Sequence, residues 1–409
     1  MPSNGAVPAR PPVPPVHVAM VSTHAPRLCG IATFTADLAS AIAVADPAMR
    51  ISWAAISEEG TDHRYGPEVK WYIRQQRAAT YGRAASAINA SDIDVVSIQH
   101  EFGLYGDWDE TFDDHLEPFL DTLERPLVTT FHTVLPDPSP SVLAAVRRIG
   151  ERSRAVVVMA ERARGILSER YALDPSTIHV IPHGVPPVAD RNRDAMKARL
   201  GLGGRRVIST FGLVDPRKGL EYMIEAMAAV VRRHPLALYL LLGKTHPELV
   251  RRAGERYRAG LRELVQAHGL EDHVRFVDEY LTQAEIVNYL VASDVYVTPY
   301  LDPHQITSGT LSYALGAGKA IVSTPYAHAI EALDEHRGLL VDFRSAHGLA
   351  QAVTRVLDSD MLRETLECNA STYGNQMAWP AVGANVSRLY RSVLIPDDSE
   401  VHAVQGRGL

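Results

Sequence analysis

The feature that most constrains the fold is a regular alternation between short apolar runs and longer amphipathic stretches. Six runs rich in β-branched residues lie before residue 184, at 17–23, 51–56, 95–99, 126–132, 155–159 and 178–183. Their apolar character is continuous, which is typical of parallel strands covered by helices on both faces. Amphipathic stretches follow some of them, for example at 33–45 and 141–153. The alternation predicts a doubly wound α/β sheet.

A second α/β series follows a stretch rich in proline and glycine at 184–206, which we interpret as an interdomain linker. Its apolar runs cover 207–214, 236–243, 274–280, 294–300, 320–325 and 338–343. Helices are expected near 219–233, 247–268, 282–292 and 309–318, then as a pair running to about 373 and a last helix at 379–394. A chain of 409 residues exceeds what one core normally supports. We therefore expect two Rossmann-like domains facing a central cleft, where ligands of open α/β sheets usually bind.

The expected domain boundaries follow from these patterns. An N-terminal domain should span 16–185, completed by a C-terminal helix at 376–395, and a C-terminal domain should span 186–375. The first fifteen residues carry five prolines among their last nine and predict a disordered tail rather than a signal peptide. The polar segment 396–409 predicts a loose tail.

Composition excludes several classes of function. The formal net charge of −7 disfavours nucleic acid as a partner, since phosphate tracking needs a basic surface. The two cysteines, Cys29 and Cys368, form no Cys-x-x-Cys pair, and the histidines lack zinc-site spacing, so no metal is expected. Cysteine usage fits a reducing, cytoplasmic compartment. No apolar run reaches the ~18–20 residues of a membrane span, so membrane contact should be at most peripheral. The oligomeric state stays open.

The loop 24–33 after the first predicted strand is the first candidate site. Gly30 would let the backbone approach a ligand, and the amides that open the following helix favour an anion or a sugar hydroxyl. His24 lies in the same loop. An ordinary β–α turn explains the loop equally well, and the three spaced glycines of a dinucleotide-binding fingerprint are missing.

Polar residues follow two further strands of this half. His100 and Glu101 come directly after the run 95–99, in a loop punctuated by glycine, and His132 ends the next run. We expect both histidines to point toward the same crevice, although a hydrogen-bonded structural histidine is the competing interpretation.

Two motifs in the second half are suited to phosphate. In 211–227 a strand ends at Gly212, and Arg217 and Lys218 precede the helix that Gly219 opens. Two cations beside a helix N-terminus suit a diphosphate. In 294–325, Ser308-Gly309-Thr310 opens a helix of small residues, and its amides and hydroxyls suit a phosphate or a sugar hydroxyl. A simple N-cap would explain one of these three residues.

On these motifs the sequence resembles the family-four retaining glycosyltransferases (glycosyl transferases group 1), which have the GT-B fold. The resemblance runs from His17 to about Leu394 and includes VIPHGV, FGLVDPRKG, LLLGK, DVYVTPY and SGTLSYALGAGKAIVST. It implies that the second domain binds a nucleotide-diphosphate sugar and that the first binds a carbohydrate or other hydroxyl acceptor.

The resemblance also implies roles for individual residues. Lys218 matches the family lysine that neutralises the diphosphate, and Arg217 would replace the arginine that the family carries where Leu213 stands here. His132 fits the histidine that contacts the donor sugar. The remaining donor-side positions, implied in the same way, are Gly30, Gly212, Tyr280, Ser308, Gly309, Thr310 and Leu311. On the acceptor side it implies His24, His100 and Glu101.

The sequence departs from the family at two positions. Aligning on GAGKAIVST places Gln305 and Tyr313 where the family has two glutamates that touch the donor sugar and the ribose. The spacing is kept and both charges are lost. Gln305 can still bond a sugar hydroxyl, whereas Tyr313 offers one hydroxyl in place of a carboxylate.

The expected reaction is glycosyl transfer with retention, in which the departing phosphate takes the acceptor's proton and no metal is required. Two other functions stay open. A retaining glycoside phosphorylase using a sugar 1-phosphate fits the altered ribose position at Tyr313, and a non-catalytic module that binds a sugar nucleotide fits the missing glutamates.

Overall fold

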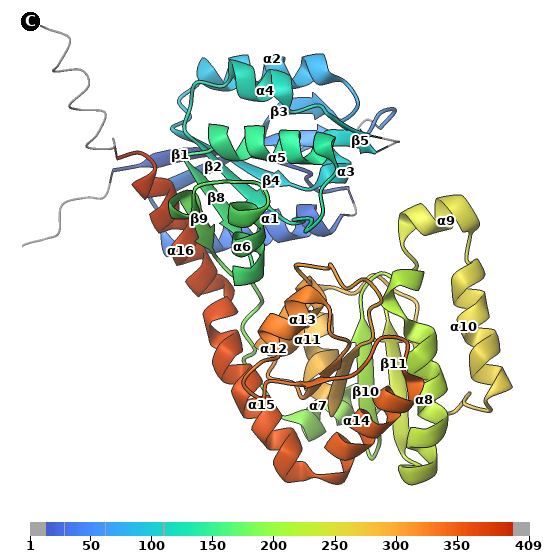
Figure 1. Ribbon diagram of the computed structural model, residues 1–409. Coiled ribbons are helices and arrows are strands. Elements are labelled where there is room, and N and C mark those ends of the chain that lie inside the picture. Colours follow the sequence, from blue (N-terminus) through green and yellow to red (C-terminus); the bar gives the residue numbers. More distant parts are fainter. Residues whose placement is uncertain (1–13, 28, 62, 109–110, 396–409) are drawn as a thin grey trace, which may run out of the picture. The chain divides into compact units, whose positions relative to one another are not determined.

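The computed structural model describes residues 14–27, 29–61, 63–108 and 111–395 (Figure 1). The tail expected at 396–409 lies outside these residues, and so does the tail expected at 1–15 apart from Pro14 and Pro15. By backbone contacts the chain divides into two compact units. Unit 1 holds the described residues of Met1–Phe131, Ser139–Val157 and Gly383–Leu409, and unit 2 holds His132–Pro138 and Val158–Val382.

The first sheet has seven strands in the order β3-β2-β1-β4-β7-β8-β9. Their bounds are β1 Val16–Ser22, β2 Met49–Ser57, β3 Val69–Arg74, β4 Val95–His100, β7 Leu127–Phe131, β8 Ala155–Val158 and β9 Ile178–Val180. The pairs from β3 to β8 are all parallel. Every residue of β4 and β7 is buried, which explains why their sequences do not alternate between apolar and exposed polar residues. β3 was not predicted, because it alternates exposed and buried positions at the edge of the sheet.

Helices connect these strands, as the alternation predicts. They are α1 Gly30–Ala45, α2 Ala78–Asn89, α3 Phe102–Tyr105, α4 Glu117–Thr122, α5 Pro140–Arg152 and α6 Glu161–Glu169. The start of α5 is encoded locally: the Ser139 side chain accepts a hydrogen bond from the amide of Val142, and Pro140 occupies the first helical position. A small antiparallel hairpin, β5 Gly106–Trp108 and β6 Phe112–Asp114, follows α3 and was not predicted.

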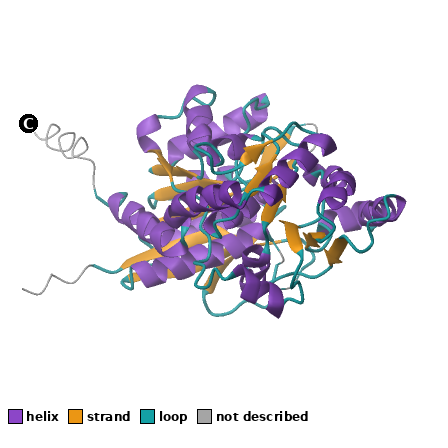
Figure 2. Ribbon diagram, turned by 90° about the horizontal axis from the view of Figure 1, so that it is seen from below, coloured by secondary structure: helices purple, strands orange, loops and turns teal. Residues whose placement is uncertain are grey.

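The second sheet has six strands in the order β12-β11-β10-β13-β14-β15, and every pair is parallel. The bounds are β10 Arg206–Phe211, β11 Ala237–Leu242, β12 Val274–Val277, β13 Val295–Thr298, β14 Ile321–Ser323 and β15 Leu339–Leu340. An apolar cluster lies on each face of this sheet: Met223, Ile224 and Met227 belong to one, and Tyr296, Leu311 and Leu315 to the other. The strands therefore run between layers of helices (Figure 2). The fold class is confirmed as two parallel α/β domains.

The helices of the second half largely match the prediction. They are α7 Arg193–Arg199, α8 Leu220–Arg233, α9 Pro247–Ala253, α10 Arg256–Ala267, α11 Gln283–Ala292, α12 Gly309–Gly316, α13 Ala327–Ala332, α14 Ala346–Asp358, α15 Asp360–Gly374 and α16 Trp379–Ser392. The single helix expected at 247–268 is wrong. Gly254 separates α9 from α10, with a left-handed φ of +61° that an uninterrupted helix cannot contain.

The last helix, α16, carries the chain from unit 2 into unit 1. Within unit 1, the Tyr390 hydroxyl donates to Ser97 Oγ at 2.7 Å, and Arg391 forms a bidentate ion pair with Asp46. In the part of the chain that the structure describes, no helix is both long and apolar enough to cross a membrane.

Candidate active site

Two glycines at the ends of neighbouring strands form one wall of the candidate site. Gly212 follows β10 with φ +125°, and Gly243 follows β11 with φ +131°, conformations that residues with a side chain rarely adopt. A Cβ on Gly243 would lie 2.3 Å from the carbonyl oxygen of Gly212. A Cβ on Gly212 would lie 3.2 Å from the Thr310 methyl group and 3.5 Å from Lys218 Nζ. The backbone at Gly212 therefore lies directly beside a cation and a threonine.

The loop after β10 fixes the position of Lys218. Asp215 caps the 3-10 turn Pro216–Lys218 by accepting from the amide of Arg217, and Gly219 ends the turn at φ +59°. A side chain at Gly219 would meet the carbonyl oxygen of Pro299 at 2.3 Å, so the loop packs tightly against the end of β13. Lys218 Nζ donates to the hydroxyl of Tyr300 at 2.8 Å and lies 4.1 Å from the centre of that ring.

The start of α12 completes the cluster. Ser308 Oγ accepts from the amide of Leu311 at 3.3 Å, and it lies 3.2 Å from Thr310 Oγ1. The Tyr300 hydroxyl lies 2.5 Å from the same Thr310 oxygen. We call Gly212, Lys218, Tyr300, Ser308 and Thr310 the cradle.

The cradle has the chemistry of an anion site. It offers an ammonium group, three hydroxyls and a glycine backbone, next to first-turn amides of α12 that have no acceptor within the helix. It lies at the carboxyl ends of β10 and β13, where the strand order of the second sheet reverses. Ligands of open α/β sheets bind at such points. The Leu311 amide donates to Ser308 Oγ, so it is already engaged within the turn. Of the backbone amides expected to bind a ligand at this helix start, those of Gly309 and Thr310 remain.

Arg217, the second cation expected at the site, forms an ion pair in this structure. Its Nε and NH2 groups donate to the two oxygens of Asp215 at 2.9 and 3.1 Å, and its side chain is 74% exposed. Burial acts to raise the pKa of Asp215, but hydrogen bonds from Arg217 outweigh it and hold that pKa below its usual value. In this structure the Nε group and one NH2 group of Arg217 are thus engaged by Asp215 rather than by the cradle.

Gln305 and Tyr313 lie on either side of the Ser308 turn. Gln305 Nε2 donates to the carbonyl oxygen of Thr307 at 3.2 Å. The Tyr313 hydroxyl accepts from Gln283 Nε2 at 2.9 Å, and its ring centre lies 5.7 Å from that of Phe211. Each of these two hydrogen bonds has a neutral partner within unit 2.

The loop expected to bind a ligand after β1 is held by neighbours within unit 1. His24 Nδ1 bonds the carbonyl oxygen of Ala25 at 2.9 Å, and its ring meets Trp53 edge-on at 4.6 Å between centres. Gly30 begins α1 and is exposed, with open space where a Cβ would point.

The structure places His100 differently from the prediction. Instead of pointing from a loop into a crevice, its side chain is fully buried at the end of β4 and stacks on Tyr105 with 5.4 Å between ring centres. Burial lowers its pKa to about 3, so the ring is neutral. Glu101 caps α3 by accepting from the amide of Phe102, and His132 directly follows β7, half-buried. His100 is the last residue of β4 and not the first residue of a loop. Its burial depends on Phe102 and Tyr105 of α3, a short helix that the sequence pattern did not predict.

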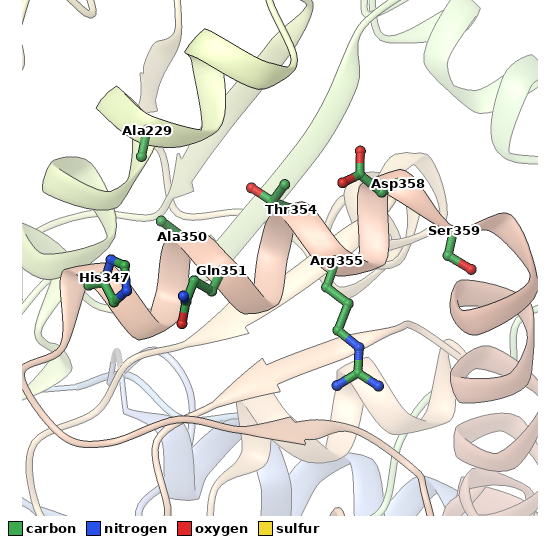
Figure 3. A pocket seen from close by; sticks show the side chains of 8 residues that line it. All are labelled: Ala229, His347, Ala350, Gln351, Thr354, Arg355, Asp358 and Ser359. Carbon is green, nitrogen blue, oxygen red and sulfur yellow. The ribbon is translucent and has the colours of Figure 1, made fainter.

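Two pockets lie in unit 2. One, of about 670 Å³, begins at Lys244 beside Gly243 and is lined mainly by charged residues of the 244–278 region: Lys244, Arg251, Glu255, Arg258, Arg262 and Asp278. Tyr280, expected near a nucleobase, follows this region and is 49% exposed. The other, of about 540 Å³, lies over α8 and α14 and shares no residue with the cradle (Figure 3).

Three residues in or next to the cradle were not singled out from sequence: Gly243, Tyr300 and His328. Gly243 is the glycine of the motif LLLGK and Tyr300 is the last residue of DVYVTPY, so their position after a strand was a usable signal. His328 lies in α13, which was not predicted, and its ring accepts from the amide of Ser308 at 2.9 Å.

Comparison with known families gives two matches. Residues 205–359 match the family described as Glycosyl transferases group 1, and residues 30–188 match Glycosyltransferase Family 4. Among curated proteins, the D-inositol 3-phosphate glycosyltransferase of Corynebacterium glutamicum is 28% identical over 306 residues, covering 68% of this chain and 69% of that protein. A phosphatidyl-myo-inositol mannosyltransferase of Mycolicibacterium smegmatis is 26% identical over 277 residues, covering 67% of each.

Solved structures share the fold at low sequence identity. HepE from Anabaena, in complex with UDP and glucose, superposes with a TM-score of 0.69 at 16% identity and covers 92% of this chain and 99% of its own. A glycosyltransferase from Rickettsia africae gives a TM-score of 0.71 at 15% identity, covering 93% of this chain and 100% of its own.

Proposed function

The chain belongs to the group 1 glycosyltransferases, and from this premise we propose that it transfers a hexosyl group from a nucleotide-diphosphate sugar to a hydroxyl acceptor with retention. The observation that carries the donor assignment is the position of Lys218 Nζ, which lies beside Gly212 and donates to the Tyr300 hydroxyl, itself 2.5 Å from the Thr310 hydroxyl. A diphosphate binds well where a cation, hydroxyls and helix amides converge.

In this proposal the sugar–phosphate bond breaks first, and the departing diphosphate gains negative charge. Lys218 and the first-turn amides of α12 stabilise that charge, and Arg217 adds to it once it leaves Asp215. The acceptor oxygen attacks the anomeric carbon on the face from which the diphosphate leaves. Its proton passes to the departing phosphate oxygen, so neither a side-chain nucleophile nor a metal is required.

The roles proposed for the other parts of the site follow the family resemblance, supported for the nucleoside by the position of one pocket. The pocket beside Lys244 directly follows the Gly243 wall, so the nucleoside would extend toward it and toward Tyr280. Gln305 would bond a hydroxyl of the donor sugar, and Tyr313 would lie near the ribose. His132, His24 and Glu101 would serve the reacting sugar and the acceptor. His100 would act only through packing, because its ring is buried.

The experiment that tests the proposal combines binding with product analysis. UDP, GDP and ADP are first titrated into the full chain, with melting temperature as the readout, because a ligand of the folded state raises it. The corresponding hexose donors are then incubated with glycans and with inositol phosphates, which the names of the relatives suggest as acceptors. NMR of the anomeric proton distinguishes retention from inversion.

Each competing function predicts a different result in the same assays. A phosphorylase would release sugar 1-phosphate from a disaccharide only when inorganic phosphate is added. A non-catalytic module would bind a nucleoside diphosphate without turnover on any acceptor. Inverted products would disprove the retaining mechanism, and a requirement for a divalent cation would disprove the metal-free account.

A further inference from the structure

The segment that leads into α12 is held by hydrogen bonds to α13. The amide of Ala327 donates to the carbonyl oxygen of Pro303 at 3.0 Å, and the amide of His328 donates to that of Gln305 at 3.1 Å. A third bond runs in the opposite direction, from the amide of Ser308 to Nδ1 of His328 at 2.9 Å. The path from Pro303 to Ser308 is therefore fixed by hydrogen bonds at three points.

The His328 ring is suited to accept this bond. It is 4% exposed, and burial together with the nearby His183 lowers its pKa to about 4, so it is neutral near pH 7. Because Nδ1 accepts from the Ser308 amide, the proton of the neutral ring lies on Nε2. Ser308 is itself 2% exposed, so its amide has no ready access to water as an alternative acceptor.

A second histidine lies against the next residue of the turn. A Cβ on Gly309 would lie 2.9 Å from Nε2 of His183, and the His183 ring is held by a 2.8 Å bond between its Nδ1 and the carbonyl oxygen of Gly184. Burial lowers the pKa of His183 to about 4 as well. Ser308 therefore contacts the buried neutral ring of His328, and Gly309 lies against the half-buried neutral ring of His183.

We propose that His328 is a positioning residue for the donor: by accepting the Ser308 amide, it fixes the turn so that the Ser308 hydroxyl and the first amides of α12 face the diphosphate. This inference rests on the proposed function. Without His328, the buried Ser308 amide lacks an acceptor, which is costly, so the turn would rearrange to regain one. Rearrangement would move the groups that contact the diphosphate, although His328 itself need not touch it.

The test compares two substitutions in the full chain. His328→Ala removes the acceptor, whereas His328→Asn can place its amide oxygen where Nδ1 stands and accept the same bond. Calorimetric titration uses whichever of UDP, GDP and ADP the wild-type protein binds. His328→Ala should weaken that binding by about tenfold, a change of the size expected for one buried hydrogen bond, and His328→Asn should stay within about threefold.

Two further readouts separate positioning from general destabilisation. Hydrogen exchange of the peptide 303–311 should be faster in His328→Ala and close to wild type in His328→Asn. The KM for the donor should rise in His328→Ala while the KM for the acceptor stays unchanged. His273→Ala is the control, because His273 also makes one backbone hydrogen bond through Nδ1, in its case to the carbonyl oxygen of Ala237 at 2.9 Å, at the start of β11 and away from the Ser308 turn. It should leave donor binding unchanged.

The outcomes distinguish this inference from the proposed function. If the wild-type protein binds none of the three nucleoside diphosphates, the donor assignment fails and the role of His328 fails with it. If the wild type binds one of them and His328→Ala binds it equally well, only the role of His328 is overturned. Equal losses in His328→Ala and His328→Asn also overturn it, because accepting the Ser308 bond would then not be what matters.

Discussion

The ammonium nitrogen of Lys218 and the phenol oxygen of Tyr300 are 2.8 Å apart, and the same phenol oxygen lies 2.5 Å from Thr310 Oγ1. One hydroxyl thus links the loop after β10 to the start of α12. Tyr300 is itself fixed, because it is 1% exposed and stacks on Tyr326 with 5.3 Å between ring centres. The cradle is therefore held in place before any ligand binds.

Replacing Lys218 with alanine should lower kcat/KM by a hundredfold or more. The reason is that a charged group aimed at a developing negative charge commonly stabilises the transition state by about 2.7–4 kcal/mol. The measurement is steady-state turnover with saturating acceptor. Lys70→Ala, an exposed lysine on β3, is the control and should turn over normally. Turnover near the wild-type rate in Lys218→Ala would remove this residue from the mechanism.

Tyr300→Phe should have a smaller effect, since it keeps the ring and removes only the oxygen that links Lys218 to Thr310. We expect kcat/KM to fall by about tenfold and the free energy of unfolding by about 1–3 kcal/mol, the net contribution of the two hydrogen bonds that the oxygen makes. Tyr239→Phe is the matched control: it also loses one buried hydroxyl bond, to Thr210 at 2.9 Å, but lies outside the cradle. Equal losses of activity in both variants would contradict a role for the Tyr300 oxygen.

Gly243→Ala should destabilise unit 2 strongly. Its φ of +131° is unfavourable for alanine, and the new Cβ would meet the Gly212 carbonyl oxygen at 2.3 Å. Strain of this kind costs about 1–3 kcal/mol before the clash is added. Gly260→Ala is the control, because Gly260 lies within α10 with open space at its Cβ, and there alanine should stabilise by about 0.5–1 kcal/mol. Urea denaturation of both variants measures the difference, and a stable, fully folded Gly243→Ala protein would contradict the described backbone.

The contribution of Asp46 to stability should depend on pH. Hydrogen bonds from Arg391 hold the pKa of Asp46 below its usual value, despite burial. A carboxyl with a lowered folded-state pKa stabilises the protein above its unfolded pKa of about 3.9 and loses that effect as pH falls through the folded value. Asp46→Asn should therefore cost about 1.5–3 kcal/mol of unfolding free energy at pH 7, and this difference should shrink below pH ~4.

Denaturation at several pH values checks this, with Asp121→Asn, an exposed aspartate on α4, as the control. A cost for Asp46→Asn that stays constant between pH 7 and pH 3 would mean that the carboxyl charge is not what stabilises the end of α16.

Most of the fold could be predicted because its strands are buried on both faces. Where strands lie at the edge, as β3 does, or where helices are short, as α13 is, the periodic signal weakens and the elements were missed. The break at Gly254 was also missed, since a glycine within an amphipathic stretch does not by itself show a left-handed φ.

Less of the candidate site than of the fold could be predicted from the sequence. Residues close together along the chain, such as Ser308 and Thr310, could be predicted to share a site, because both lie at the start of the same helix. Contacts between distant segments could not: the pairing of Lys218 with Tyr300 and of Ser308 with His328 depends on strand order and loop path. The exposed ion pair of Arg217 with Asp215 likewise follows from side-chain rotamers that the sequence does not specify.

The contact between Gly212 and Gly243 has a consequence for how this enzyme could change its substrate. Because two backbones touch there with no room for a Cβ, substitution cannot reshape that wall without breaking it. Under the proposed function, side chains next to the Ser308 turn, such as Gln305 and Tyr313, offer more room to alter donor preference than these glycines do. An engineer seeking a different donor would leave the glycines alone and vary those two positions first.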